Sequence, residues 1–267
     1  MRIEGLTTCV GERYAGYLEK SLPIWLDTLD SVTVVTDAAT DDILPNLIQG
    51  NLQFHVTDIF TRHGASFNKG AALSSGFATI KKPDWILNFD ADIIPPQNWR
   101  KDIERLLLPR KLFGCSRRFR SSGDVIPDSA FPDLWGFFHL WHVSDPHNWI
   151  RPVYPVDCGH AGNYDHTFLR RWPEDCRVDL SPPLKLIHQG EPRTSWFGGD
   201  PKNAQKMLNL FTLGLWEAWW TKAGHIQVPE PEVNEVIERD DLKPEEIQQV
   251  LDRYTDMDPF RYAVRIE

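Results

Sequence analysis

The sequence predicts an α/β fold, in which helices connect the strands of a central sheet and flank it. In the first half of the chain, short runs of β-branched and apolar residues alternate with segments of helical periodicity. This alternation is typical of parallel strands joined by crossover helices. Acidic residues also stand directly after several of the runs, where the carboxyl ends of parallel strands meet and ligands bind.

The elements of the first half follow in order from these patterns. Strands are expected at Arg2–Cys9, Ser31–Thr36, Leu52–Val56 and Asp84–Phe89. Helices are expected at Glu12–Leu29, at Asp41–Gln49, from the candidate N-cap Ser66 to Ile80, and from Pro96 to Leu108. Pro23 is expected to break or kink the first helix, because proline cannot donate a helical hydrogen bond.

The second half is less regular. Strand-like pieces begin at Leu112 and include Leu134–Val143, and a further strand is expected at Leu184–His188. Helices are expected at Asn163–Trp172 and Lys202–Lys222, and from Pro244 to Tyr254 after an acidic, proline-bearing segment.

Composition excludes several classes of protein. The chain has 267 residues, of which 41% are hydrophobic, so it is long enough to bury a sizeable core. Its formal net charge of −9 argues against a protein that coats nucleic acid or anionic lipid. Residues Met1–Val10 lack the pattern of a signal peptide, and the longest apolar run, Leu134–Val143, is too short to span a bilayer. Four cysteines without C-x-x-C spacing suit reduced thiols, so we expect a cytoplasmic protein with no transmembrane segment.

The most informative motif is an Asp-x-Asp that directly follows an apolar strand. Asp90 and Asp92 stand at the end of this strand, just before two prolines. Two neighbouring carboxylates repel each other, and a divalent cation relieves that repulsion. Such a cation is commonly held by one or two carboxylates together with substrate phosphates. The alternative is that the two aspartates only begin a turn.

The order and spacing of several motifs resemble a known group of enzymes. Phe67–Ala72 (FNKGAA) and then Phe89–Asp92 (FDAD), with the opening Thr7–Tyr14 (TTCVGERY), resemble nucleotide-sugar-dependent glycosyltransferases of the glycosyltransferase-A fold. The similarity is to the family-2 type and to the carboxyl-terminal part of the β-1,4-galactosyltransferase type, and it covers about Ile3 to Gly199. It implies a Rossmann-like mixed sheet flanked by helices.

The resemblance also implies a set of donor-binding residues. Thr8 and Glu12 in the turn after the first strand, with Asp37 at the end of the second, would hold the nucleoside. Asn68 and Lys69 would face the nucleotide, and Asp90 and Ala91 would lie near the ribose. Asp92 would ligate a metal, Mn²⁺ or Mg²⁺, that bridges the two phosphates, with Asp90 as a less favoured ligand. For Asp37 and Lys69, a strand-end turn and a solvated helix start are equally good interpretations.

The segment Cys158–Trp172 resembles the part of inverting members that carries the catalytic base. Asp165 is the one carboxylate in the stretch that corresponds to the consecutive acids of the galactosyltransferases, although its register can differ by one residue. It would act as general base on the acceptor hydroxyl; the alternative is a first-turn aspartate that stabilises a helix dipole. Gly162, Asn163 and Tyr164, together with Trp135, would contact the acceptor.

Two further groups have plausible roles. His188, at a strand end, resembles the third metal ligand of several glycosyltransferase-A enzymes, and an imidazole ligand would favour Mn²⁺. Arg193 would assist the diphosphate from a flap over the donor, unless its segment is an ordinary loop. Arg110, Lys111, Arg117, Arg118 and Arg120 form a basic cluster that either receives an anionic acceptor or, as we favour, is a solvated face.

Together these features predict a metal-dependent glycosyltransferase that inverts the anomeric carbon and uses a nucleotide-sugar donor, which we expect to be a UDP-sugar. The acceptor class stays open among glycan, glycolipid, protein and modified nucleic acid, and the oligomeric state is open too. The catalytic domain is expected at residues 1–223, with a donor half (1–110) and an acceptor half (111–223), followed by a C-terminal helical extension at 224–267. The alternatives are a non-catalytic carbohydrate-binding or scaffold protein of the same fold, and a nucleotidyltransferase.

Overall fold

The computed structural model describes residues 1–44, 50–64, 67–81, 83–126, 134–145, 153–154, 156, 161–181 and 183–190. All of them belong to the first of two units into which the chain divides, Met1–Gly199. The predicted helices Lys202–Lys222 and Pro244–Tyr254 and the predicted domain boundary after residue 223 lie outside the described residues. They stay predictions.

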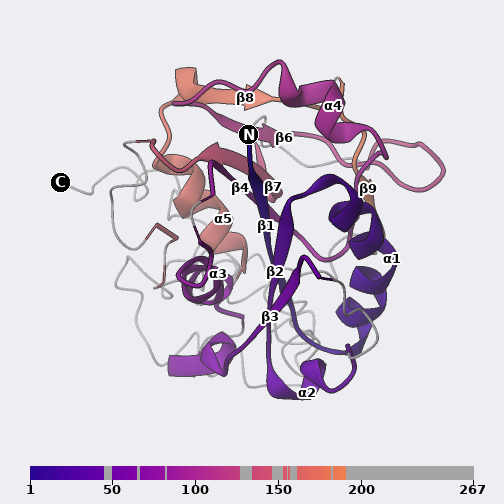
Figure 1. Ribbon diagram of the computed structural model, residues 1–267, viewed down its shortest axis with the longest axis vertical. Helices are drawn as coiled ribbons and strands as arrows, with labels where there is room; N and C mark the ends of the chain where they lie inside the picture. The colour runs from indigo at the N-terminus through magenta and orange to yellow at the C-terminus, as the bar shows by residue number, and fades with distance from the viewer. Residues whose placement is uncertain are drawn as a thin grey trace, which may run out of the picture. The chain divides into compact units, whose positions relative to one another are not determined.

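A seven-stranded mixed sheet organises the described part of the chain (Figure 1), with strand order β3-β2-β1-β4-β7-β6-β8. Strands β1 to β4 are mutually parallel, and β7 runs antiparallel to both of its neighbours, β4 and β6. The strands are β1 (Ile3–Cys9), β2 (Ser31–Thr36), β3 (Leu52–Val56), β4 (Trp85–Phe89), β6 (Leu112–Cys115), β7 (Trp135–His142) and β8 (Arg177–Asp179). A separate two-stranded sheet pairs β5 (Ile93–Ile94) with β9 (Ile187–His188).

Helices cover both faces of the sheet. Figure 1 shows α1 and α4 on one side of it and α3 and α5 on the other. The helices are α1 (Glu12–Thr28), α2 (Ala38–Asp41), α3 (Lys69–Phe77), α4 (Trp99–Glu104) and α5 (Ala161–Arg170), with 3₁₀ helices η1 (Ile59–Gly64) and η3 (Glu174–Cys176). The predicted α/β fold is therefore confirmed, and the strands predicted in the first half agree with β1 to β4 to within one residue.

The helix boundaries differ more from the prediction than the strands do. Helix α1 continues through Pro23, because this proline lies on the exposed side of the helix. There, water can donate a hydrogen bond to the backbone carbonyl that loses its helical partner. Helix α2 comprises Ala38–Asp41 and ends where the predicted helix Asp41–Gln49 was expected to begin, and residues 45–49 of that prediction lie outside the described residues. Helix α3 begins after Asn68 rather than at Ser66, because the Asn68 side chain caps it by accepting a hydrogen bond from the Ala71 amide at 2.9 Å. Helix α4 begins only at Trp99, three residues after Pro96.

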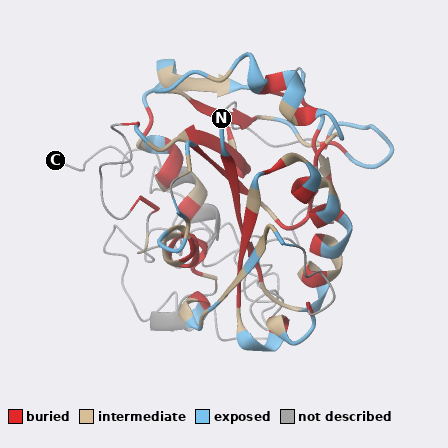
Figure 2. Ribbon diagram, in the orientation of Figure 1, coloured by how far each residue is buried: buried red, intermediate tan, exposed pale blue. Residues whose placement is uncertain are grey.

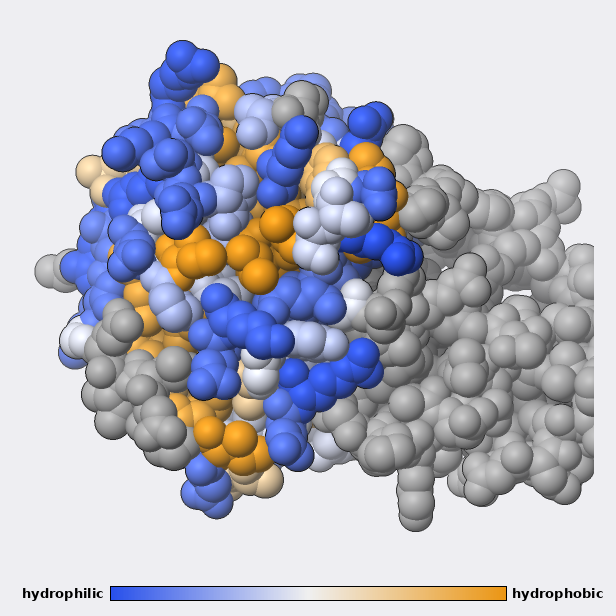
Figure 3. Space-filling view, turned by 90° about the vertical axis from the view of Figure 1, so that its right-hand side faces the viewer, coloured by the Kyte–Doolittle hydropathy of each residue, from blue (hydrophilic) through white to orange (hydrophobic). Residues whose placement is uncertain are grey.

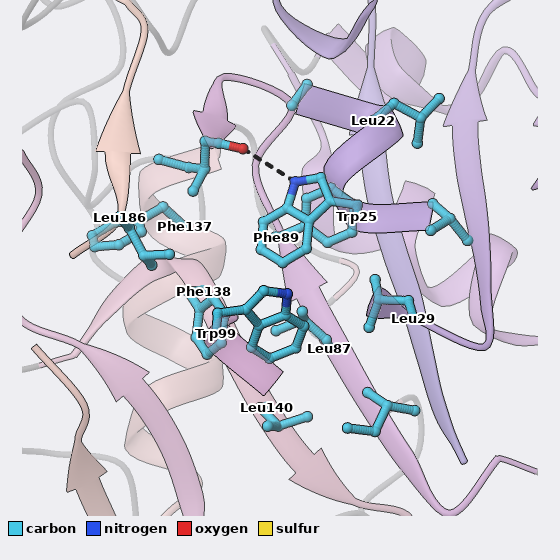
Figure 4. Close-up of a cluster of buried hydrophobic side chains, with 14 of the residues drawn as sticks. Leu22, Trp25, Leu29, Leu87, Phe89, Trp99, Phe137, Phe138, Leu140 and Leu186 are labelled. Carbon is cyan, nitrogen blue, oxygen red and sulfur yellow. Dashed lines mark hydrogen bonds between the residues drawn. The ribbon is translucent and has the colours of Figure 1, made fainter. Parts of the chain in front are cut away.

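The core on the α1 side of the sheet is aromatic. Trp25 stacks on Phe89 with ring centroids 4.3 Å apart and meets the edge of Trp99 at 5.5 Å (Figure 4). Figure 2 shows that strands β1, β2, β4 and β7 are buried along most of their length. On the face that carries α1, hydrophilic side chains dominate the surface, with small apolar patches between them (Figure 3). None of the helices in the described part of the chain combines the length and apolarity needed to cross a lipid bilayer.

Candidate active site

The Asp-x-Asp segment is fixed by hydrogen bonds to its backbone. Helix α1 donates two of them: Ser21 Oγ to the carbonyl of Ala91 at 3.1 Å, and the indole N–H of Trp25 to the carbonyl of Ile93 at 3.1 Å (Figure 4). The amide of Asp90 donates to the carbonyl of Phe137 in β7 at 3.1 Å. The methyl group of Ala91 is buried. The two carboxylates are therefore held at the carboxyl end of β4 by a rigid backbone.

The short β5–β9 ladder brings Asp92 and His188 together. Ile93 is paired with His188 in this ladder, and the amide of Gln189 donates to the carbonyl of Asp92 at 2.9 Å. As a result, Nε2 of His188 lies 3.2 Å from Oδ2 of Asp92, and both side chains are almost fully buried. Residues 92 and 188, far apart in the sequence, thus form one pair.

The chemistry of this pair fits a divalent cation. Nδ1 of His188 lies 2.9 Å from the carbonyl of Gly190, which can only accept a hydrogen bond, so a neutral ring carries its proton on Nδ1 and points the lone pair of Nε2 at the Asp92 carboxylate. Two ligands that bind a cation at about 2.1 Å on adjacent octahedral positions are about 3 Å apart, close to the distance found here. The other oxygen of Asp92, Oδ1, is buried and has no hydrogen-bond partner among the described residues. Asp92 and His188 would hold Mn²⁺ or Mg²⁺.

The set of protein ligands is small. Within the described ranges, no three His, Cys, Asp or Glu side chains gather around a single point. A cation here would therefore take its other ligands from phosphate oxygens and water, as is usual for a hard cation bound with a nucleotide. Gly190 is part of the arrangement, because a Cβ at this position would lie 3.1 Å from Cε1 of His188 and 3.2 Å from Oδ2 of Asp92.

A second cluster surrounds the ammonium group of Lys69. Nζ donates to Oδ1 of Asp90 at 2.7 Å, to Oδ1 of Asp165 at 3.1 Å and to the carbonyl of Gly136 at 3.2 Å. The ammonium also lies 5.1 Å from the centroid of the Tyr164 ring. The Lys69 side chain is only 3% exposed, whereas those of Asp90 and Asp165 are 34% and 23% exposed. The buried cation thus joins two carboxylates that reach toward the surface.

The topology explains this convergence. Because β7 is antiparallel to β4, its first residues lie at the edge where β4 ends, beside Asp90. Helix α5 packs against β7 and places Asp165 so close to Gly136 that a Cβ there would lie 1.9 Å from the aspartate Cγ. Helix α3 starts beside the same edge and supplies Lys69.

The electrostatics of the cluster follow from burial and from these charges. Burial raises the pKa of Asp165 to about 6, against the opposing effect of the Lys69 charge. Burial likewise raises the pKa of Asp90, and Lys69 again opposes the shift. Burial lowers the pKa of Lys69, but the two carboxylates outweigh it and raise this pKa above its ordinary value. Lys69 is therefore a permanent cation here, while Asp165 can exchange a proton near neutral pH.

The residues predicted to bind the nucleoside lie at the same edge of the sheet. The ends of β1 and β2 are paired, Thr8 with Val35 and Cys9 with Thr36, and Asp37 directly follows the second pair. Oδ1 of Asp37 caps α2 by accepting from the amide of Thr40 at 2.8 Å. The turn after β1 needs Gly11, whose φ of 87° is in the left-handed region and whose amide donates to Oγ1 of Thr40 at 2.7 Å. Glu12 is exposed at the start of α1.

Other predicted site residues have varied surroundings. The Asn68 side chain is occupied by the chain itself, since it caps α3 and donates to the carbonyl of Val156 at 2.8 Å. Tyr164 is fully buried and its hydroxyl accepts a hydrogen bond from Asn88 at 2.9 Å, so it supports the Lys69 cluster from within the fold. Trp135 is half-buried at the start of β7. The side chains of Gly162 and Asn163, and the whole of Arg193, lie outside the described residues.

Three residues near the site were not assigned to it from the sequence, although Arg118 was named there as part of the basic cluster. Burial and then the charges of Asp92 and Asp90 raise the pKa of Tyr14, which places this α1 side chain beside the Asp-x-Asp segment. The guanidinium of Arg118 lies over the rings of Trp135 and Phe137, at 5.7 and 5.4 Å, and its charge lowers the pKa of Asp165. Gly136 is the third. Tyr14 follows the helical spacing of the apolar face of α1 and ends the Thr7–Tyr14 motif, but neither pattern assigns it a role at the site.

The basic cluster is thereby divided. Arg117 and Arg120 are exposed, as expected for a solvated face. Arg118 is half-buried against aromatic rings near Asp165 and does not belong to that face.

The structure resembles those of known enzymes. No family model matches the sequence, and a comparison with curated proteins finds no match. Residues 1–349 of S. aureus TarS, in complex with UDP-GlcNAc, are 13% identical to this chain with a TM-score of 0.50, over 89% of this chain and 70% of that one. The mannosyltransferase PcManGT from Pyrobaculum calidifontis, in complex with GDP-Man and Mn²⁺, is 15% identical with a TM-score of 0.47, over 88% and 68% of the chains. A nucleotidyl transferase from Methanothermobacter is 13% identical with a TM-score of 0.42, over 72% and 89%.

At these identities a structural match shows the fold and no more, and of the three scores only that of TarS reaches 0.5. TarS is a glycosyltransferase of the A type. The mixed seven-stranded sheet with helices on both of its faces agrees with that fold. The chain therefore has the glycosyltransferase-A fold that its motifs predict.

Proposed function

We propose that the chain is a glycosyltransferase that moves a sugar from a nucleotide donor, which we expect to be a UDP-sugar, to an acceptor hydroxyl with inversion at the anomeric carbon. One observation carries the proposal. Two features lie at the same edge of the sheet: the pair Asp92–His188, which can bind a cation, and Asp165, a carboxylate of raised pKa. Asp90 stands beside both, because it is close to Asp92 in the sequence and shares the ammonium of Lys69 with Asp165. Metal-dependent transfer from a nucleotide sugar with inversion needs these two kinds of site side by side.

The donor would lie along the ends of β1, β2 and β4. Thr8, Asp37 and Glu12 would hold the nucleoside, and Asp90 and Ala91 would lie near the ribose. Arg193, with Asn68, stays a further predicted contact. A divalent cation bound between Asp92 and His188 would offset the negative charge that develops on the leaving diphosphate.

Asp165 would act as the general base. Its Oδ1 is held by Lys69, so Oδ2 is the oxygen that can take a proton. The acceptor oxygen forms a bond to the anomeric carbon as the bond from that carbon to the diphosphate breaks, and the hydroxyl proton passes to Oδ2 of Asp165. Because attack comes from the face opposite the leaving group, this arrangement predicts inversion.

The acceptor would approach over Trp135 and the start of α5, where Gly162 and Asn163 stand. Arg118 lies against Trp135, so the acceptor side of the site would carry a positive charge beside an aromatic surface. The proposal leaves the acceptor class open. The domain plan expected from the sequence, with a donor half at 1–110 and an acceptor half at 111–223, and a cytoplasmic location belong to the same proposal.

The test is turnover of a panel of nucleotide sugars with and without Mn²⁺. Turnover is measured as the release of nucleoside diphosphate, and the anomeric configuration of the product is then determined. Asp92→Asn should abolish turnover, Asp165→Asn should lower it by about 100- to 10,000-fold to a measurable residual rate, and Asp27→Asn, at an exposed carboxylate on α1, serves as the matched control. A retained anomeric configuration would overturn the role of Asp165. Release of pyrophosphate from a nucleoside triphosphate and a sugar phosphate would indicate a nucleotidyltransferase, and nucleotide-sugar binding without any hydrolysis would indicate a binding module.

A further inference from the structure

The ammonium of Lys69 has no N–H group left to donate to a phosphate of the sugar donor. A lysine ammonium has three N–H groups. In this structure three oxygens accept from it, one each from Asp90, Asp165 and Gly136, and the side chain is almost fully buried. A residue that contacts the diphosphate needs at least one N–H directed at it. The N–H groups of Lys69 instead point into the fold, toward two carboxylates from different parts of the chain.

We propose that Lys69 is a positioning residue that fixes the general base Asp165 against Asp90 and keeps it ionised, so that the donor side and the acceptor side of the site share one internal cation. The inference rests on the proposed function and assigns Lys69 a role different from the donor contact that the sequence motif implies.

The surroundings of Lys69 restrict where the ammonium can lie. It is the first residue of α3, and the Asn68 cap fixes the start of that helix. On the α5 side, the ring of Tyr164 lies against the ammonium and is held in turn by the hydrogen bond from Asn88 to its hydroxyl. A cation held this firmly loses little conformational freedom when it fixes a neighbouring carboxylate.

The charges explain why a cation is needed. Asp90 and Asp165 bear like charges and share the ammonium of Lys69, and Asp165 would take up a proton more readily without this positive neighbour. The charged groups that influence Asp165 are Lys69 from α3, Asp90 after β4 and Arg118 after β6. Of these, Lys69 is the cation with a direct hydrogen bond to Asp165.

The contact also selects one atom of the base. Because Lys69 and Gly136 confine Oδ1 of Asp165, the carboxylate cannot rotate freely and Oδ2 keeps a single direction. When Oδ2 takes the acceptor proton, Lys69 keeps its bond to Asp90, so the ammonium is never left buried without an anion.

The experiment compares Lys69→Met with Lys69→Arg, with Lys101→Met, at an exposed lysine of α4, as the control. In K69M we expect kcat to fall by about 100-fold, as for a misplaced catalytic group. The KM for the donor should stay within about threefold, because Lys69 does not touch the donor. The acid limb of the kcat–pH profile should move up by about 1–3 pH units, the usual effect of removing an opposite charge at this distance. K69R should bring the midpoint back toward that of the wild type.

A double-mutant cycle with Asp165→Asn then tests whether Lys69 acts through the base. Once Asp165 is gone, K69M should reduce residual turnover less than threefold, because residues that act as a unit are not additive. Full additivity would overturn the proposal. An acid limb of the kcat–pH profile that does not move in K69M would also overturn it, even if the variant is less stable. The same holds if the donor KM of K69M rises by the factor by which kcat/KM falls.

A direct measurement separates this inference from the proposed function. The pKa of Asp165, followed by NMR of ¹³C-labelled aspartate in the full chain, should rise in K69M whether or not the enzyme turns over. If Lys69→Met does not fold, Asp90→Asn gives the same information, since loss of the second carboxylate leaves Lys69 to Asp165 alone and should lower the pKa of Asp165. A pKa that moves in a protein without transferase activity would remove the proposed function but keep the Lys69–Asp165 pairing, and an unchanged pKa would remove the pairing.

Discussion

Gly136 and Asp165 touch so closely that no side chain fits between them. A Cβ on residue 136 would lie 1.9 Å from Cγ of Asp165 and 1.9 Å from its Oδ1, which is far inside van der Waals contact. The glycine at the start of β7 therefore sets how near α5 can bring its carboxylate to the end of β4.

Gly136→Ala should consequently damage activity more than stability. The added methyl group pushes Asp165 aside, and a shift of about 1 Å in a catalytic group costs about 100-fold in rate. Overpacking should lower the free energy of unfolding by about 1–3 kcal/mol. Steady-state kinetics and denaturant unfolding measure the two effects. Gly16→Ala is the matched control, because a Cβ there meets nothing within 4 Å, and this helical substitution should be neutral or stabilising by up to about 1 kcal/mol. Equal activity of the two variants would contradict the placement of Asp165.

The pH dependence of turnover should follow Asp165. Its pKa is raised by burial to about 6, so the carboxylate is deprotonated, and can accept a proton, above that pH. We expect kcat to fall about tenfold for each pH unit below 6, and the control variant Asp27→Asn to share this limb. A kcat–pH profile in saturating donor and acceptor measures it. An acid limb near pH 4, the ordinary range for an aspartate, would mean that another group is the base.

Cation binding should depend on both members of the Asp92–His188 pair. Asp92→Ala and His188→Ala each remove one ligand, so Mn²⁺ should bind at least about 10-fold more weakly in each, with circular dichroism unchanged. Titration calorimetry with Mn²⁺, in the presence of UDP, gives the affinity. Asp27→Ala should bind as the wild type does. Unaltered Mn²⁺ affinity in His188→Ala would exclude His188 as a ligand.

His139 should make the protein sensitive to acid. Its ring is fully buried, stacks on Phe168 at 5.4 Å, and neither nitrogen has a hydrogen-bond partner among the described residues. Burial, with a smaller contribution from the Lys69 charge, lowers its pKa to about 3. Between about pH 6.5 and 3 the unfolded chain therefore binds a proton that the folded chain does not, and stability falls as the pH is lowered through this range.

The variant His139→Phe should remove that dependence. It should flatten the slope of unfolding free energy against pH by up to about 1.4 kcal/mol per unit between pH 6 and pH 4. Above pH 7 it should be neutral or slightly stabilising, because no polar group is left without a partner. Urea unfolding at several pH values tests this, with His142→Phe, on the same strand but not fully buried, as the control. An unchanged slope in His139→Phe would show that the acid sensitivity comes from other groups.

Much of the fold could be predicted from the sequence because its signals are local. The β-branched run of β2 and the apolar run of β4 mark buried strands without any knowledge of their partners. The starts of α3 and α4 were harder, because several capping residues and a proline stand near each other and tertiary contacts decide among them.

The site could be predicted in part for the same reason. Asp90 and Asp92 could be predicted because they directly follow an apolar strand, and His188 because a strand ends at it. The partners of Lys69 could not be inferred, since Asp165 and Gly136 reach it through the antiparallel placement of β7, which no local pattern encodes. Arg118 was hidden among exposed arginines, and only its packing on Trp135 distinguishes it.

The two-residue ladder between β5 and β9 has a consequence for how this protein matures. It joins Ile93, near the middle of the described chain, to His188, near its end, and contacts between such distant segments form late because the intervening loop must first close. A nascent chain that has completed β1 to β4 already displays both aspartates, yet the proposed cation site still lacks the imidazole of His188. If the proposed cation site is real, capture of metal should therefore mark a late stage of assembly, and a cell would not load the incomplete chain.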